Sequence, residues 1–385
     1  MSTPSDRGPA ARRWCVPPAL LREPHETLEG AHVLDEVPGE LGLVLWESLR
    51  DVLLWAEAGE GQRAGLFQDG AAPVRFERIR DARPEVGVEL ALTTVAALVA
   101  DPAAAIPALL ATVCAEVARW AEERGCGTTA LSYAQAAALA CPDDPDPAVE
   151  VGRMALRQGR LQRAESWLRR GVGVARRGQG WAAYTRAYLA LGELLRARGR
   201  AEDARRHLLK SVRAARRFGV PEVRGDAWHL LFLLARDGGE HAQAERMAGL
   251  AVRAYGRGHP RLPVLLLDLA RLWVARDEFT RAVPVLKRVA ERQGEPRDNA
   301  GALALLARAA AGAGDRPTFE EAWSRAWSVI RHLEDPLVPP SALVDLSRAA
   351  AMLGDWDRME QAVRRREPAT PASRPRRDAT PETHP

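Results

Sequence analysis

The sequence predicts an all-α protein in which helical hairpins repeat along the chain to form an α-solenoid. Alternating runs of β-branched residues, which would mark strands, are absent from the 385 residues, and alanine, leucine and arginine dominate. Residues 188–218 predict two amphipathic helices separated by a break at Gly199. The residues that define the facing sides of these two helices are Tyr188, Leu191, Gly192, Leu195, Ala204, Leu208 and Ser211.

The same pattern of two helices and a break occurs seven times along the chain. The break residues are Gly125, Gly159, Gly199, Gly239, Asp277, Gly314 and Gly354. An aliphatic residue lies eight positions before each break, and further packing positions lie five and nine positions after it. A single hairpin cannot bury its apolar face alone, so these copies are expected to stack on one another. Phe319 and Met359 depart from the small residues found at the first packing position of the other copies.

This pattern resembles the tetratricopeptide repeat (TPR), whose consensus combines W-x₂-L-G-x₂-Y with a following A-x₃-F. Leu191, Gly192 and Ala204 occupy such positions in the hairpin at Gly199, and successive breaks are 34 to 40 residues apart. The resemblance implies a right-handed superhelix of about seven TPR hairpins, capped at its N-terminus by non-repeat helices. It indicates architecture much better than it indicates a ligand.

Composition divides the chain into four expected segments. These are a disordered arm over residues 1–27, a non-repeat helical cap over 28–110, the TPR solenoid over 111–366 and a disordered tail over 367–385. Both terminal segments are rich in proline and arginine and contain too few apolar residues to pack a core. A repeat stack needs its ends covered, which is the role we expect of the cap.

Within the cap, two helices are expected over residues 38–57 and 85–100, where apolar residues recur at helical spacing. Between them, closely spaced glycines and prolines predict an irregular segment over residues 59–84. Asp101 and Pro102 then predict the N-cap and first turn of a further helix.

No motif in the sequence points to catalysis, a cofactor or a metal ion. The glycine pattern that begins at Gly59 imitates a dinucleotide fingerprint, but it follows a predicted helix rather than a strand. The four cysteines form no CxxC pair, and no histidine lies at the spacing of a zinc site. We therefore expect a protein that is not an enzyme and that uses no cofactor.

The sequence contains no apolar run of a signal peptide and none of transmembrane length, which predicts a cytoplasmic protein without a membrane partner. Lys210 and Lys287 are the only lysines among 55 basic residues. This excess of arginine, with abundant alanine and glycine, suggests GC-rich bacterial coding.

Charge is distributed unevenly along the chain. Residues 1–150 contain 12 basic and 24 acidic side chains, whereas residues 151–220 contain 18 basic and 4 acidic ones. We call residues 151–220 the basic block. It is either a solvated outer face or a surface for an acidic partner, which includes the chain's own acidic N-terminal third.

The TPR resemblance also implies which side chains line the concave groove. Two positions beyond each packed aliphatic residue, five of the seven side chains are arginine. With flanking residues, the predicted partner-binding set is Arg119, Arg153, Arg186, His229, Arg236, Arg271, Arg308 and Arg348. Repeated guanidinium groups suit carboxylates or phosphates and favour an acidic ligand. The alternative is that these arginines pair with neighbouring carboxylates on the helix surface.

Three functions follow from these observations. The sequence favours a non-enzymatic adaptor or scaffold that holds a protein or peptide in the concave groove. The second interpretation is the sensor part of a transcriptional or signalling regulator, although residues 1–110 contain no helix-turn-helix pattern. The third is a nucleic-acid-binding solenoid, for which basic residues are present but exposed interleaved aromatic residues are not. The sequence does not predict the oligomeric state.

Overall fold

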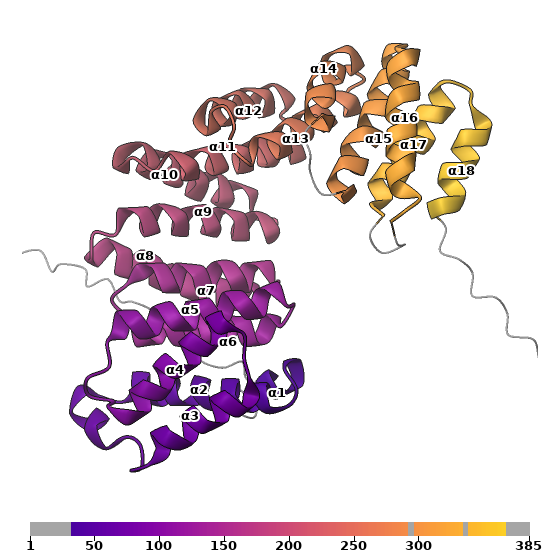
Figure 1. Cartoon of the computed structure of the whole chain (residues 1–385). Helices are drawn as coiled ribbons and strands as arrows, with labels where there is room; N and C mark the ends of the chain where they lie inside the picture. Colours follow the sequence, from indigo (N-terminus) through magenta and orange to yellow (C-terminus); the bar gives the residue numbers. More distant parts are fainter. Residues whose placement is uncertain (1–31, 292–295, 334–337, 367–385) are drawn as a thin grey trace, which may run out of the picture. The chain divides into compact units, whose positions relative to one another are not determined.

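The computed structural model describes residues 32–291, 296–333 and 338–366, and the regular secondary structure over these ranges is entirely helical (Figure 1). This confirms the predicted all-α class. The expected arm over residues 1–27 and tail over 367–385 lie outside the described residues. The chain divides into two compact units, residues 1–237 and 238–385, which we describe separately.

The first unit begins with the cap. Its helices are α1 (His32–Glu36), α2 (Glu40–Glu57), α3 (Ala71–Ala82) and α4 (Val86–Ala100), with a 3₁₀ turn, η1, at Glu60–Gly65. The expectation of an irregular segment over residues 59–84 was therefore wrong. Helix α3 forms because Ala72 and Ile79 are buried on one face, while Arg75 on the same helix donates to the buried Asp51 carboxylate at 2.9 Å. Gly70 supplies the left-handed turn that precedes α3.

The expected helix start at Asp101 was also wrong. The Asp101 side chain accepts from the amide of Ala104 at 3.1 Å and holds a short turn, and the next helix begins at Pro107. This helix starts four residues before the expected solenoid boundary at 111.

The repeat helices of the first unit pack as successive pairs that lie side by side (Figure 1). They are α5 (Pro107–Glu123), α6 (Gly127–Ala140), α7 (Pro145–Arg157), α8 (Leu161–Arg177), α9 (Trp181–Ala197), α10 (Ala201–Phe218) and α11 (Pro221–Asp237). The second unit continues the pattern with α12 (His241–Tyr255), α13 (Leu262–Ala275), α14 (Phe279–Ala290), α15 (Pro296–Ala313), α16 (Arg316–Ile330), α17 (Pro340–Met352) and α18 (Trp356–Arg366). The boundary between the units falls at the break of the fourth hairpin.

All seven predicted breaks have a left-handed backbone conformation, with φ between 58° and 76°. In the hairpin at Gly199, the amide of Arg200 donates to the carbonyl of Leu195 at 2.9 Å, as in a Schellman motif. Asp277 replaces glycine at one break and still has φ of 58°, a conformation that aspartate tolerates better than most residues. The recurring glycine therefore marks a real helix end in each copy.

The predicted packing positions lie between the paired helices. Leu208 is fully buried, and Leu191 is 5% exposed. A Cβ atom added to Gly192 would lie 2.6 Å from the Leu208 side chain, so glycine is what lets α9 and α10 approach closely. The exception is the last hairpin, where Val363 is 39% exposed, the neighbouring Ala362 is buried instead, and Met359 is only half-buried.

Cap helix α1 is attached to the first repeat by a long-range hydrogen-bonded contact. Helix α6 has no side-chain cap of its own at Cys126. The Glu36 carboxylate instead accepts from the amides of Thr128 and Thr129, at 2.9 and 2.7 Å. Burial alone would raise the pKa of Glu36, but these hydrogen bonds outweigh it and hold the pKa below its usual range. Glu36 thus caps a helix that lies 92 residues further along the chain.

We expect Gly192→Ala to destabilise the first unit, because the new methyl group overlaps Leu208. Overpacking of this kind lowers the free energy of unfolding by about 1–3 kcal/mol, which exceeds the gain in helix propensity of about 0.5–1 kcal/mol. Gly249→Ala on α12 is the matched control, since a Cβ there meets only the tip of Arg253 at 3.9 Å. Urea denaturation followed by circular dichroism measures both. Equal stability of the two variants would contradict this packing.

A second prediction concerns Glu36. Because its folded-state pKa is lowered, the carboxylate stabilises the fold above the unfolded-state pKa of about 4.3, and this contribution is lost as the pH falls through the folded-state pKa. Glu36→Gln should therefore lower the free energy of unfolding by about 1 kcal/mol at neutral pH and by progressively less in acid. Glu77→Gln, at an exposed position on α3, is the control. A difference between Glu36→Gln and the wild type that stays constant down to acidic pH would refute the assigned role.

Candidate functional site

A groove of about 740 Å³ lies in the first unit, along the first helices of three successive hairpins, α5, α7 and α9. Small side chains form its floor, and they leave room for the side chains of a ligand. These are Ala108, Ala111, Ala115 and Ala118 from α5 and Ala134 and Ala137 from α6. Ala118 and Ala137 are buried, whereas Ala115 is exposed to the groove. The alanine floor is therefore apolar.

Three of the predicted partner-binding arginines, Arg119, Arg153 and Arg186, line this groove together. Sequence reasoning missed the carboxylates beside them, which are Glu116, Glu122, Asp144, Asp146 and Glu150. With three guanidinium groups and five carboxylates, the lining carries a net charge of −2. These acidic residues lie at positions that the arginine pattern does not mark, on α5 and α7 and, for Asp144, at the N-cap of α7.

Two of the three groove arginines already have partners. The Arg153 guanidinium donates to Glu150 on its own helix at 3.1 Å. The Arg186 guanidinium donates across the hairpins to Asp146, at 2.6 Å. Arg119 forms no ion pair with a described residue and is exposed. One guanidinium group is thus available to a ligand without the rupture of an existing pair.

The two remaining predicted residues of the first unit lie on α11. His229 is only 9% exposed, so little of its ring can contact a ligand, and the proposed site does not include it. Arg236 donates to the neighbouring Asp237 at 2.9 Å.

In the second unit, Arg271, Arg308 and Arg348 lie on successive first helices, α13, α15 and α17. All three interact electrostatically with Asp345, and Arg308 donates to it at 2.9 Å. Burial raises the pKa of Asp345, while the arginines, with Arg308 the strongest, act in the opposite direction. Arg271 also pairs with Asp268 on its own helix, at 3.2 Å. The structure therefore brings these three predicted arginines together, around an aspartate that the sequence pattern did not reveal.

Much of the basic block is neutralised within the first unit. The Arg157 guanidinium donates to Glu122 at 2.8 Å, and Arg169 and Arg198 both pair with Glu165. Arg213, on α10, is exposed and forms no ion pair with a described residue. The block is therefore less positive in its effect on solvent than its count of arginines implies.

Aromatic side chains do occur in the basic block, between α9 and α10. Trp181 stacks on Phe218 with ring centroids 4.5 Å apart. Lys210 donates to the Tyr188 hydroxyl at 2.7 Å, and Tyr184 packs edge-on against Tyr188. Because these rings pack against one another, the ring faces in these contacts are not available to stack on bases.

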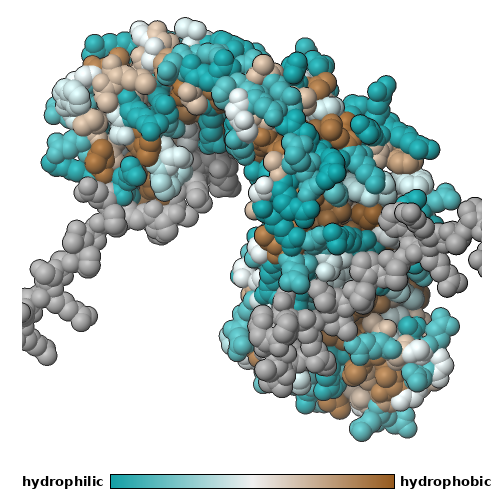
Figure 2. All heavy atoms as spheres, turned by 180° about the vertical axis from the view of Figure 1, so that it is seen from behind, coloured by the Kyte–Doolittle hydropathy of each residue, from teal (hydrophilic) through white to brown (hydrophobic). Residues whose placement is uncertain are grey.

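Three further features of the described residues concern a buried thiol, potential metal ligands and the length of apolar helices. Burial raises the pKa of the Cys114 thiol to about 12, so it remains protonated and acts as a small apolar side chain. Residues 32–291, 296–333 and 338–366 contain no cluster of three or more potential metal ligands, and none of their helices is long and apolar enough to cross a membrane. On the face drawn in Figure 2, hydrophobic residues lie scattered among hydrophilic ones.

A scan against models of protein families finds no match, and a search of the curated proteins finds none either. Among solved structures, the chain is similar to a signal transduction ATPase with numerous domains (STAND) that has a TPR sensor, from Pyrococcus horikoshii. The TM-score is 0.54 at 13% identity, over 78% of this chain and 53% of that one. It is also similar to aspartyl phosphate phosphatase F from Bacillus subtilis, with a TM-score of 0.51 at 8% identity, over 86% of this chain and 96% of that one.

These likenesses concern the fold. Together with the seven left-handed breaks and the buried packing positions, they show that the chain has an all-α, helical-repeat solenoid fold like that of TPR proteins.

Binding of nucleic acid by the basic block should be weak and strongly salt-dependent. Because most of its arginines have internal partners, we expect a single-stranded RNA oligomer to bind at about 50 mM salt and to be largely released at about 200 mM. Replacing the exposed Arg213 and Arg216 by Gln should weaken the low-salt binding further. Fluorescence anisotropy of a labelled oligomer measures this. Tight binding that resists salt would rank a nucleic-acid function above the adaptor.

Proposed function

We propose that this protein is a non-enzymatic adaptor or scaffold that holds a peptide segment of a partner protein in the groove of α5, α7 and α9. The observation that carries this proposal is the groove itself, about 740 Å³ with an alanine floor and charged side chains from three successive hairpins. A groove of this kind suits a segment that places small apolar side chains on the floor and polar ones at the rim.

The charge of the groove lining changes the ligand charge that we expect. The sequence favoured an acidic ligand, but carboxylates outnumber guanidinium groups in this groove. We infer a segment of mixed charge, with an acidic group for Arg119 and a basic group for Glu116, neither of which has an ion-pair partner among the described residues. The arginine cluster around Asp345 in the second unit supports a preference for acidic groups at that separate surface.

A peptide library displayed on phage tests the groove, because it selects binding sequences before any partner has been identified. Peptides selected on the full chain should lose at least tenfold in affinity when Ala115→Trp fills the floor. Ala201→Trp, at the exposed start of α10, is the matched control and should leave binding unchanged. Fluorescence anisotropy of the selected peptide measures each affinity, and thermal denaturation confirms that both variants fold.

Charge reversal gives the second arm of the same experiment. Arg119→Glu should weaken a mixed-charge peptide by about tenfold, because it replaces an attractive contact by a repulsive one, and a peptide with its acidic residue changed to lysine should recover part of the loss. Unchanged binding by Ala115→Trp and Arg119→Glu alike would exclude this groove as the binding site.

A sensor module of a signalling regulator is the second candidate function. It is favoured by the likeness to the STAND protein, whose TPR part is described as a sensor. Affinity purification of the tagged chain distinguishes the two candidates. An adaptor should recover the protein that supplies the peptide, whereas a sensor should recover an ATPase or a DNA-binding protein whose activity changes when the peptide is added. The cytoplasmic location and bacterial origin stay predictions.

A further inference from the structure

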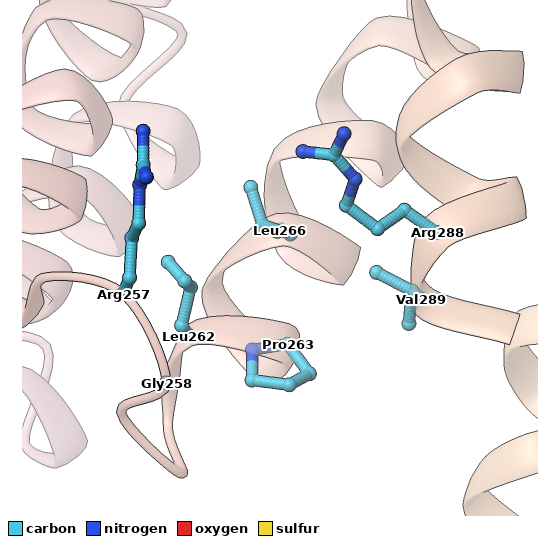
Figure 3. Close-up of a pocket in the computed structure, with 7 residues that line it drawn as sticks. All are labelled: Arg257, Gly258, Leu262, Pro263, Leu266, Arg288 and Val289. Atoms are coloured by element: carbon cyan, nitrogen blue, oxygen red, sulfur yellow. The ribbon is translucent and has the colours of Figure 1, made fainter. Parts of the chain in front are cut away.

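A second pocket, which we call the arginine pocket, lies in the other unit and shares no residue with the groove of α5, α7 and α9. It has a volume of about 180 Å³ and opens between the α12–α13 loop and helices α13 and α14. Leu262, Leu266 and Val289 form its half-buried apolar wall. Arg257 and Arg288 stand on opposite sides of this wall, as Figure 3 shows.

The loop that carries Arg257 has a defined conformation. Gly256 and Gly258, on either side of the arginine, have φ of 72° and 85°. His259 stacks on Tyr255 with ring centroids 4.3 Å apart, and its Nδ1 accepts from the amide of Arg261 at 3.2 Å. The backbone at Arg257 is therefore held by glycine conformations that other residues rarely adopt and by an aromatic contact beside them.

The positive charge of the arginine pocket has no counter-ion among the described residues. The sequence between Glu245 and Asp268 contains no acidic residue. Neither Arg257 nor Arg288 forms an ion pair or hydrogen bond with a described residue, although Glu291 lies only three positions from Arg288. This distinguishes the pocket from the groove, where two of the three arginines are already paired.

We propose that this pocket binds a small organic acid with a short branched apolar chain. The carboxylate lies between the two guanidinium groups, whose planar forks match its geometry, and the chain packs against Leu262 and Leu266. The volume corresponds to about six water molecules at roughly 30 Å³ each, which is the size of a five-carbon acid with its carboxylate at the mouth. An inorganic anion would leave the apolar wall in contact with water.

Three probes test the chemistry on the full chain: 3-methylbutanoate, its neutral amide and inorganic phosphate. Isothermal titration calorimetry, supported by saturation-transfer NMR of the ligand, should show binding of the acid, with the amide at least tenfold weaker because it lacks the charge. Phosphate should also bind more weakly than the acid. Phosphate binding as tight as that of the acid would overturn the proposal and indicate an anion site only.

Variants locate the site. Arg257→Gln and Arg288→Gln should each weaken binding of 3-methylbutanoate by about tenfold. Arg253→Gln, on the exposed side of α12 and outside the pocket, should not change it. Leu266→Asn should weaken binding of the acid while it leaves the thermal denaturation cooperative. Undiminished binding after the loss of both pocket arginines would overturn the proposal. Ala115→Trp should leave this binding intact, so failure of the groove proposal would not affect it.

Discussion

The close approach of paired helices, as between α7 and α8 and between α9 and α10, is the constraint on which the rest of this structure depends. It is most severe where glycine faces leucine, at Gly152 against Leu168 and at Gly192 against Leu208, since a Cβ atom at either glycine would overlap the leucine. Close packing also fixes the spacing of the first helices, and thereby the distance between the charged side chains that they carry into the groove. A substitution that separates one pair of helices should therefore alter the ligand site as well as the stability.

At the N-terminal end of the stack, the cap supplies hydrogen-bond partners to the first repeat. Helix α6 presents amides that its own sequence does not satisfy, and Glu36 accepts two of them. Tyr133 on α6 donates its hydroxyl to the carbonyl of Leu45 on α2 at 2.6 Å, which ties a second cap helix to the same repeat. The cap therefore completes the hydrogen bonding of the first repeat in addition to covering its apolar face. A truncation that removes α1 and α2 should expose the α6 amides and the Tyr133 hydroxyl to water. It should also weaken the packing of α5 and α6, which line the N-terminal end of the groove.

The repeat architecture could be predicted from the sequence because each break and packing position is a local signal repeated seven times. Helix α3 was missed because its stability comes from long-range contacts, such as that between Arg75 and Asp51, rather than from an uninterrupted periodic pattern. The site was only partly predictable for a related reason. The arginine positions follow from the repeat, but their partners Asp146 and Asp345 lie on neighbouring hairpins, 40 and 37 residues away, so no single repeat reveals them.

These cross-hairpin pairs give the groove and the arginine pocket different chemical character. In the groove, a ligand carboxylate that binds Arg186 must compete with Asp146. The net gain in binding free energy is therefore only the difference between two similar ion pairs. The charge arrangement of such a lining therefore contributes more to specificity between partners than to affinity. This property suits an adaptor that must release its partner. At the arginine pocket, Arg257 and Arg288 have no such competitor among the described residues, so an anion contributes binding free energy directly. Selectivity there must come from the apolar wall, which favours an acid only if its chain fits between the leucines and Val289.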